Sequence, residues 1–377
     1  MTKHIGIIGG GIVGATAAYY LTKENQQVTL FDEGIGQATS AAAGIISPWL
    51  SQRRNKEWYF LAKEGAKFYQ TLMSDLATHG ETSHIYQQTG TILYKKTPTL
   101  LEKLEKLATT RLEDAPEIGT IQRLSAEETK QKIPAIALED ETLFITGGAK
   151  VDGSSLVEAL LSEVTNSGNN VLSDKISNIS YENSKWQVTS SSTTYSFDTL
   201  ILACGAWVGD LLRPLDYFVD IRPQKGQLIE VTTDLNTTDW PVIMPVGETD
   251  IIPFSDGKIL VGATHENEMD FDLIPDNSLL NQLKKDAELI MPSLKTGTVT
   301  GVRVGTRAYT SDFSPFFGEI ETLPHLYLAS GLGSTGLTMG PIIGKTLADW
   351  SLNKETDFEI YRHKPNQYIY PNSKLKN

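Results

Sequence analysis

Apolar and polar residues alternate in blocks at the start of the chain. The apolar run Ile5 to Ile8 enters a glycine cluster, an alanine-rich helix-forming segment follows from Ala15 to Thr22, and a second apolar run covers Val28 to Phe31. A strand, a helix and a second strand in this order predict a β-α-β unit.

Further along the chain, apolar residues recur at helical spacing in four segments, with strand-like runs between them. Helices are predicted for residues 57–79, 125–132, 152–164 and 279–291, the second with Ser125 as N-cap and Glu128 three residues later. Strands are predicted for residues 89–94, 171–179, 186–190, 199–203, 227–231 and 258–262. Pro and Asp-Gly turns separate the later strands, so this region is expected to be largely antiparallel.

The β-α-β pattern is interrupted by segments with the antiparallel strand pattern, and this predicts two interleaved domains. We expect an α/β (α+β) fold in which a Rossmann-like domain consists of residues 1–80, 146–215 and 300–377. A mainly antiparallel β domain for the substrate would consist of residues 81–145 and 216–299. A chain of 377 residues is long enough for two such cores.

Charge, cysteine content and hydropathy narrow the class of protein. A net charge of −13 argues against a nucleic-acid partner, which requires clustered Lys and Arg. The single Cys204 excludes an internal disulfide and fits a reducing cytoplasm. Because no run approaches ~20 apolar residues, no transmembrane segment is expected, and glycines in the first 14 residues favour a mature strand and turn over a signal peptide. The polar tail from Tyr370 to Asn377 is expected to be disordered.

The first β-α-β unit carries a dinucleotide-binding pattern. Gly9, Gly11 and Gly14 follow the spacing that allows a tight turn, close approach of a pyrophosphate and close packing of the helix on the strand. Asp32 ends the second strand, where a carboxylate accepts hydrogen bonds from ribose hydroxyls and disfavours a 2′-phosphate. The residues themselves leave NAD and FAD open.

Three later segments also suit a flat ligand. Residues 34–50 are rich in small residues, although a flexible surface loop is the alternative interpretation. The strand 199–203 ends at Cys204 and Gly205, again small residues. Near the C-terminus, residues 327–350 repeat the order of strand, glycine-rich turn and helix, so that a second helix N-terminus could face a phosphate or an anionic ring.

Seven motifs in order carry a family resemblance. They are GGGIVG at 9–14, TSAAAG at 39–44, the AxGAW element at 203–207, PxKGQ at 223–227, PFSDGKILVGAT at 253–264, GTRAYTSDFSPFFG at 305–318 and ASGLGSTGLTMGP at 329–341. With these motifs the sequence resembles the FAD-dependent D-amino acid oxidase superfamily, and within it glycine oxidase and the bacterial amine and D-amino acid dehydrogenases. The resemblance implies an FAD-binding domain interleaved with an antiparallel β substrate domain.

The resemblance also implies a set of FAD-binding residues. It places Gly9, Gly11, Ile12, Val13 and Gly14 near the pyrophosphate, Asp32 and Glu33 near the adenosine ribose, and Ala38, Thr39, Ser40, Ala43, Gly44 and Ile45 along the phosphates and flavin. It places Ile176 at adenine, Ala203 and Gly205 near the cofactor, and Leu332, Gly333, Ser334, Thr335, Gly336, Leu337 and Thr338 beside the isoalloxazine. No cysteine lies in the block where some sarcosine oxidase relatives attach flavin, so FAD is expected to be non-covalent.

Arg307 occupies the family's substrate-carboxylate position and is the candidate catalytic residue. An arginine can hold a carboxylate through two hydrogen bonds and leave the amine free; a structural salt bridge is the alternative role. Arg303 lies at even spacing on the same strand and is the second candidate, with a structural role favoured.

Two positions depart from the glycine oxidase pattern. Asp250 stands where glycine oxidase has a substrate-contacting tyrosine, and Ser334 replaces a loop arginine. An acid near the substrate could disfavour a second carboxylate and favour a cationic group, so specificity for glycine is in doubt. Cys204 is interpreted as a small buried hydrophobe, the six histidines show no metal-ligand spacing, and His265 follows a family motif near the substrate region.

These observations predict a cytoplasmic flavoenzyme that oxidises a small D-amino acid, glycine or a secondary amino acid. Hydride transfer to flavin N5 would give an imine that hydrolyses to an oxo acid. One alternative is a non-catalytic flavin-binding subunit of a multi-component dehydrogenase. The other is an NAD-dependent dehydrogenase, which has no need of the second cofactor turn. The expected partner is a small amino acid or amine, with a homo-oligomer as a further possibility.

Overall fold

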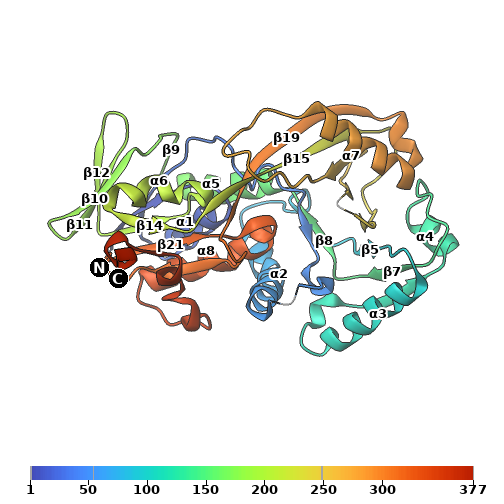
Figure 1. Ribbon diagram of the computed structural model, residues 1–377, viewed down its shortest axis with the longest axis horizontal. Coiled ribbons are helices and arrows are strands. Elements are labelled where there is room, and N and C mark those ends of the chain that lie inside the picture. The colour runs from blue at the N-terminus through green and yellow to red at the C-terminus, as the bar shows by residue number, and fades with distance from the viewer. Residues whose placement is uncertain (1, 54, 248, 377) are drawn as a thin grey trace.

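The computed structural model describes residues 2–53, 55–247 and 249–376. Two lobes lie side by side along the long axis in Figure 1, and each is built around one large sheet. The left lobe contains both chain ends and a six-stranded sheet, whereas the right lobe contains an eight-stranded sheet.

The six-stranded sheet is parallel except for one edge strand. Its order is β20 (Phe316–Glu319), β21 (Leu326–Ser330), β13 (Thr199–Leu202), β1 (His4–Ile8), β2 (Gln27–Phe31) and β9 (Asn170–Leu172). Only β20 runs antiparallel to its neighbour. The strands are almost wholly apolar because helices or loops cover both faces of a parallel sheet.

Three helices pack together against this sheet. They are α1 (Ile12–Lys23), α5 (Gly153–Asn166) and α8 (Gly336–Ser351), and the long α2 (Lys56–Ala77) crosses α8. Gly14 shows why the first turn requires glycine, since a Cβ there would lie 1.9 Å from the carbonyl oxygen of Gly9. The glycine therefore lets α1 begin directly beside the end of β1.

The eight-stranded sheet forms the second lobe. Its order is β19 (Thr298–Tyr309), β15 (Arg222–Thr232), β18 (Lys258–Gly262), β17 (Asp250–Pro253), β16 (Val242–Met244), β5 (Thr91–Leu93), β7 (Thr142–Ile145) and β6 (Ile121–Leu124). All neighbouring pairs are antiparallel except β16 with β5. The expected mainly antiparallel domain is therefore present.

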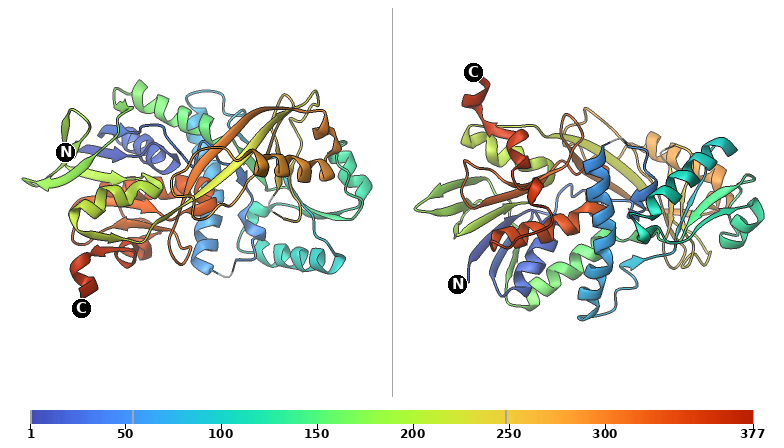
Figure 2. Two further views of the ribbon diagram at one scale, coloured as in Figure 1. Left: turned by 45° about the horizontal axis from the view of Figure 1, so that its top comes forward. Right: turned by 90° about the horizontal axis from the view of Figure 1, so that it is seen from below.

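The helices α3 (Pro98–Leu112), α4 (Ala126–Lys132) and α7 (Asn277–Ile290) belong to this lobe and lie on its outer side in Figure 2. The predicted capping box at the start of α4 is confirmed: the Ser125 hydroxyl accepts from the Glu128 amide at 3.2 Å, and the Glu128 carboxylate accepts from the Ser125 amide at 2.8 Å. One face of the sheet packs on α7, which leaves the other face to meet the first lobe.

Small sheets complete the molecule. They are β3 (Ile45–Ile46) with β8 (Ala149–Val151) and β4 (Tyr86–Gln87), the meander β10 (Asn178–Glu182), β11 (Lys185–Thr189) and β12 (Thr194–Phe197), and the pair β14 (Tyr217–Val219) with β22 (Ile369–Pro371). The short helix α6 (Val208–Leu212) follows the end of β13.

Three expectations need correction. The boundary expected at residue 300 does not separate the lobes, because β19 spans it and pairs with β15 along its whole length. The single strand expected for residues 171–179 is two strands, β9 and β10, with Ile176 between them. The tail is not disordered up to Lys376, because β22 pairs with β14 and the amide of Asn372 donates to the carbonyl of Asp216 at 2.9 Å.

Candidate active site and cofactor cavity

A cavity of about 740 Å³ lies where the two lobes meet. Its first half is lined by the ends of β1 and β2, the segment 35–48, and the turn before α8. Its second half is lined by the inward face of the eight-stranded sheet. One cavity is therefore lined by parts of the chain that are far apart in the sequence: residues between 8 and 48, the turn before α8 and several strands of the eight-stranded sheet.

Most of the residues expected at the cofactor line this cavity. They are Gly9, Gly11, Ile12, Val13, Asp32, Glu33, Ala38, Thr39, Ala43, Gly44, Ile45, Ile176, Ala203, Gly205 and 332–338, and Arg307 lines it as well. Gly14 and Ser40 lie outside this lining. Gly14 packs against Gly9, and the Ser40 hydroxyl donates to Gln37 Oε1 at 2.7 Å.

The N-termini of helices α1 and α8 both lie at the cavity and lack side-chain caps on their first residues. The N-cap of α1 is Gly11, which has no side chain to cap the helix, and Thr39 Oγ1 accepts only the amide of Ile12, at 3.0 Å. The N-cap of α8, Thr335, makes no side-chain capping bond. Uncapped amide groups and the positive end of a helix dipole are suited to a phosphate or to negative charge on a ring.

Asp32 organises the nucleotide turn. Its carboxylate accepts the backbone amide of Gly10, the amide of Gly34 at 2.6 Å and the side-chain amide of Gln37 at 2.8 Å. Glu33 lines the same part of the cavity and pairs with Lys175 at 3.2 Å. The end of the cavity expected to face the ribose is therefore acidic, and backbone amides hold the Asp32 carboxylate in place.

At the other end of the first half, the loop before α8 is held by Tyr309. The Tyr309 hydroxyl accepts the amide of Ser334 at 2.9 Å. Arg53 approaches the same serine from a different segment, with Nη2 at 3.4 Å from Ser334 Oγ, and its guanidinium lies 4.7 Å from the Trp58 ring. Ser334 stands where the glycine oxidase pattern has a loop arginine, and Arg53, which no motif indicated, brings a guanidinium back to this position.

Arg307 lies on the inward face of β19. Its Nη1 donates to Gln224 Oε1 at 3.0 Å and to the carbonyl of Thr264 at 2.8 Å. The guanidinium covers Gly226 so closely that a Cβ there would lie 2.7 Å from it. Glycine on β15 therefore provides the space in which this side chain lies against the sheet and reaches the cavity.

Arg303 has a different environment, although it shares this face of β19. Its guanidinium contacts Glu230 at 2.5 Å and Asp152 at 3.4 Å, and Nη1 donates to the carbonyl of Ser40 at 3.3 Å. It does not line the cavity. The contacts with Asp152 and Ser40 join the two lobes, whereas Glu230 lies on the paired strand β15, and this is the structural role favoured for Arg303.

The inward face of the sheet adds lining residues that sequence reasoning did not find. Gly226, Gly262, Met244, Leu93 and Lys95 come from β15, β18, β16, β5 and the residues after β5. Alternation along single strands could have placed them on one face, but the strand order 19-15-18-17-16-5 cannot be read from the sequence. His265 also lines the cavity and is exposed to solvent.

Two ionisable groups in the lining have shifted acidities. Burial raises the pKa of the Asp250 carboxyl to about 7, and nearby Lys95 only partly opposes the shift. Burial raises the pKa of the Cys204 thiol to about 12, so the sulfur is uncharged at neutral pH and is not an activated nucleophile. This environment agrees with Cys204 as a small buried hydrophobe.

The residues present fit FAD. The cavity offers two uncapped helix starts, small residues along the 38–45 segment, and an acid at the ribose end. Within the described ranges, no cluster of His, Cys, Asp and Glu could hold a metal ion. In the same part of the chain, the helices are all too short or too polar to cross a bilayer.

Comparisons with known proteins agree with this geometry. The model of the family "DAO: FAD dependent oxidoreductase" matches residues 4–350. The oxidoreductase YurR of Bacillus subtilis is 39% identical over 95% of this chain and 97% of its own length, and a glycine oxidase of Pseudomonas putida is 28% identical over 90% and 92%. The crystal structure of iminodiacetate oxidase from Chelativorans sp. BNC1 matches with a TM-score of 0.91 and 32% identity, and covers 95% of this chain and 98% of its own.

The match covers the glycine turn, both sheets and the turn before α8, which together form the cavity. The cofactor is accordingly FAD and not NAD. The chain belongs to the DAO family of FAD-dependent oxidoreductases.

Proposed function

We propose that this protein oxidises a small amino acid or secondary amine that carries a carboxylate. The observation that carries the proposal is the position of Arg307 in the cavity, beyond the turn that precedes α8. FAD, when bound, supplies an acceptor for the hydride that leaves the carbon bearing the amine. The iminium product would hydrolyse in water to an oxo acid or an aldehyde acid and the remaining amine.

The residues of this chain would orient the substrate. Arg307 would bind the carboxylate, because a guanidinium offers paired N–H donors in one plane. The contacts to Gln224 and Thr264 use Nη1 and hold the guanidinium against the sheet before substrate arrives. Restricting the substrate in this way is how an enzyme gains rate without an acid or base at the reacting carbon.

Two relatives support an amine substrate. Proteins similar to this chain along most of its length bear the names glycine oxidase and iminodiacetate oxidase. A primary amino acid and a secondary amine both place a C–H bond next to nitrogen, so the same cofactor serves for both. We propose a secondary amine as the preferred substrate class. Iminodiacetate oxidase, which is 32% identical to this chain, is named for a secondary amine, whereas the glycine oxidase named above is 28% identical.

The test is anaerobic reduction of the bound flavin. Purified holoenzyme is mixed with glycine, sarcosine, iminodiacetate, D-alanine and L-proline, and the flavin absorbance is followed. Bleaching by at least one of them is expected. If none bleaches the flavin but a co-purifying partner restores turnover, the protein is a subunit of a multi-component dehydrogenase. If no substrate acts under either condition, the proposal is wrong.

Replacing Arg307 should remove substrate capture. Arg307→Ala is expected to lower kcat/KM by the equivalent of about 2 to 5 kcal/mol, because a desolvated carboxylate loses its charged partner. Arg222→Ala is a suitable control, since Arg222 is exposed on the neighbouring strand and does not line the cavity. Stopped-flow flavin reduction measures both variants. Equal kinetics for Arg307→Ala and the wild type would contradict the role.

A cytoplasmic location and a homo-oligomeric state stay predictions. Fractionation of cells and sedimentation of the holoenzyme would test them.

A further inference from the structure

We propose that Lys95 binds a second carboxylate of the substrate, at the end of the cavity opposite Arg307. The substrate would then be an amine with carboxylates at both ends. This inference rests on the proposed function and specifies its substrate class.

Lys95 and Arg307 lie at two ends of one surface. Arg307 is on β19, the first strand of the eight-stranded sheet, and Lys95 follows Leu93, the last residue of β5, the sixth strand in that order. Strands lie about 4.8 Å apart, so the two positions are separated by several strand widths. A substrate that reached both would be longer than glycine.

The surface between these two residues is mostly without charge. Gly226, Gly262, Met244 and Leu93 line it, and Asp250 is the acid among them. An extended substrate could therefore follow the face of the sheet from one cation to the other.

Lys95 has no hydrogen bond or ion pair with any residue that the structure describes, although it is half-buried in the cavity wall. An ammonium group offers three donors and requires an acceptor or water. Structural lysines elsewhere in the chain do have partners: Lys63 pairs with Asp114 at 2.8 Å, and Lys225 pairs with Asp272 at 2.6 Å. Lys95 is part of the cavity lining, where a substrate carboxylate would neutralise its charge.

Asp250 does not cancel this charge. The positive charge of Lys95 lowers the pKa of the Asp250 carboxyl, so the two groups are near each other. Among the described residues, however, they do not form an ion pair within 4.0 Å. Burial makes its carboxyl easier to protonate than an ordinary aspartate, and a protonated carboxyl can donate a hydrogen bond to a carboxylate. The expectation that Asp250 disfavours a second carboxylate considered the acid without its neighbouring lysine.

The experiment measures ligand binding to the holoenzyme without turnover. Diglycolate and methoxyacetate are ethers that differ by one carboxylate and have no amine to oxidise. Their dissociation constants are obtained from the change in flavin absorbance on titration. Adipate and hexanoate form a second pair with greater length. The variants are Lys95→Met and, as matched control, Lys96→Met, because Lys96 is exposed and does not line the cavity.

Lys95→Met should weaken binding of the better dicarboxylate by about tenfold or more, and binding of its monocarboxylate partner by less than about twofold. Lys96→Met should change neither. Equal effects of Lys95→Met on both members of each pair, or no effect on either dicarboxylate, would overturn the proposal. That result is distinct from failure of the proposed function, in which no amine reduces the flavin of the wild-type protein.

Discussion

A single carboxyl group, that of Asp250, shows how position changes the chemistry of a residue. In the unfolded chain it has the ordinary acidity of aspartate, whereas in the folded protein burial raises its pKa to about 7. The same cavity is lined by Lys95 after β5, Arg307 from β19 and His265 after β18. The net effect is a carboxyl group that ionises near neutral pH in the half of the cavity lined by the eight-stranded sheet.

This shift predicts a pH dependence of stability. The folded state retains the proton of Asp250 up to about pH 7, whereas the unfolded state releases it near pH 4. Between these values the folded state binds more protons, so this group makes the free energy of unfolding fall as pH rises. Asp250→Asn removes the titration. The variant should gain stability relative to wild type by at least about 1 kcal/mol on going from pH 5 to pH 8.

Urea unfolding of the wild type and of Asp250→Asn at both pH values measures this difference. Asp256→Asn serves as a control, since Asp256 is exposed in the turn after β17 and lies outside the cavity. A stability difference between wild type and Asp250→Asn that does not change with pH would contradict the shifted acidity.

At the scale of elements, the segment 266–276 forms a strap from the second lobe to the first. The buried ammonium of Lys225 holds it by donating to Asp272 at 2.6 Å and to the carbonyl of Ile274. At the middle of the strap, the Phe271 ring lies 4.9 Å from the ring of Trp207, which lines the cavity. The strap therefore packs against Trp207, a residue of the cavity wall.

Loosening this strap should weaken FAD retention. Phe271→Ala removes an aromatic contact worth about 0.5 to 1.5 kcal/mol, which corresponds to a roughly two- to tenfold larger dissociation constant for FAD. Met269→Ala is the control, because Met269 is as exposed as Phe271 in the same strap but takes no part in the ring contact with Trp207. Flavin fluorescence on dilution of the holoenzyme reports release. FAD release that is no faster from Phe271→Ala than from Met269→Ala would show that the strap does not retain the cofactor.

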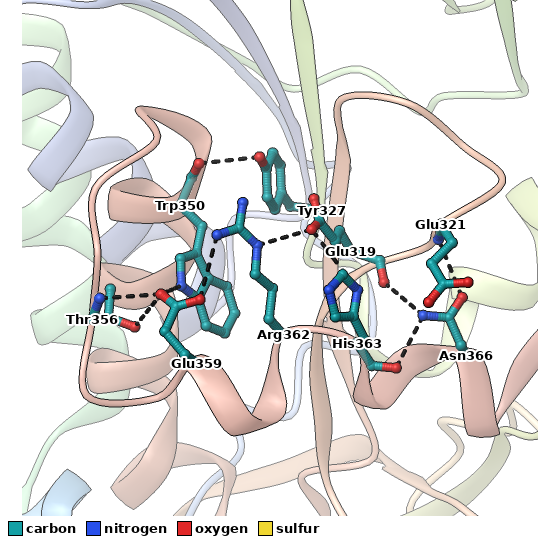
Figure 3. A network of polar contacts seen from close by, with 9 residues as sticks. All are labelled: Glu319, Glu321, Tyr327, Trp350, Thr356, Glu359, Arg362, His363 and Asn366. Atoms are coloured by element: carbon teal, nitrogen blue, oxygen red, sulfur yellow. Dashed lines mark hydrogen bonds and ion pairs between the residues drawn. The ribbon is translucent and has the colours of Figure 1, made fainter.

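The C-terminal segment is fastened to the first lobe by a network centred on Arg362 (Figure 3). Its guanidinium contacts Glu319 of β20 at 2.8 Å and Glu359 at 3.4 Å. Glu359 in turn accepts the indole N–H of Trp350, the residue before the end of α8, at 2.7 Å. Burial lowers the pKa of Arg362, but the ion pair with Glu319 outweighs it and the pKa is raised.

Breaking this network should lower stability without changing the active site. Arg362→Met is expected to reduce the free energy of unfolding by about 1 to 3 kcal/mol, because Glu319 and Glu359 lose a partly buried partner. Lys374→Met, on the exposed tail, is the control. Thermal unfolding measures the change, and flavin reduction by substrate should be the same in both variants. A loss of flavin reduction with unchanged Tm would contradict this assignment.

At the scale of the whole molecule, the cofactor cavity lies between two lobes that share part of one apolar core, because Ile5 of β1 and Ile145 of β7 belong to the same buried cluster. Helices α1 and α8 of the first lobe and the face of the eight-stranded sheet contribute to the same lining. A ligand that contacts both lobes stabilises the folded state of both by mass action. Bound FAD should therefore raise the free energy of unfolding of both lobes together.

Adding FAD to the apoprotein should raise Tm. At a free concentration 100 times the dissociation constant, the stabilisation is about 2.7 kcal/mol, which corresponds to a shift of several degrees. NAD at the same concentration should give no shift. Differential scanning calorimetry distinguishes these outcomes, and a single transition in the holoenzyme would indicate that the lobes unfold together. An equal shift with NAD would contradict the assigned cofactor.

Local sequence determined the elements and the cofactor turns, because both depend on residues close together in the chain. The spacing of Gly9, Gly11 and Gly14 was sufficient for the first turn, and Ser125 with Glu128 was sufficient for the start of α4. The motif order indicated the family before any contact was known, and the match over residues 4–350 bears this out.

Tertiary structure alone decided which strands are neighbours and therefore which side chains share the cavity. Arg303 and Arg307 have the same spacing pattern, but only one lines the cavity, because acids from other segments bind the other. Lys95 and Asp250 come from distant strands and meet through the strand order of the sheet. Pairing between distant strands depends on how whole faces pack, and this information is not contained in any local pattern.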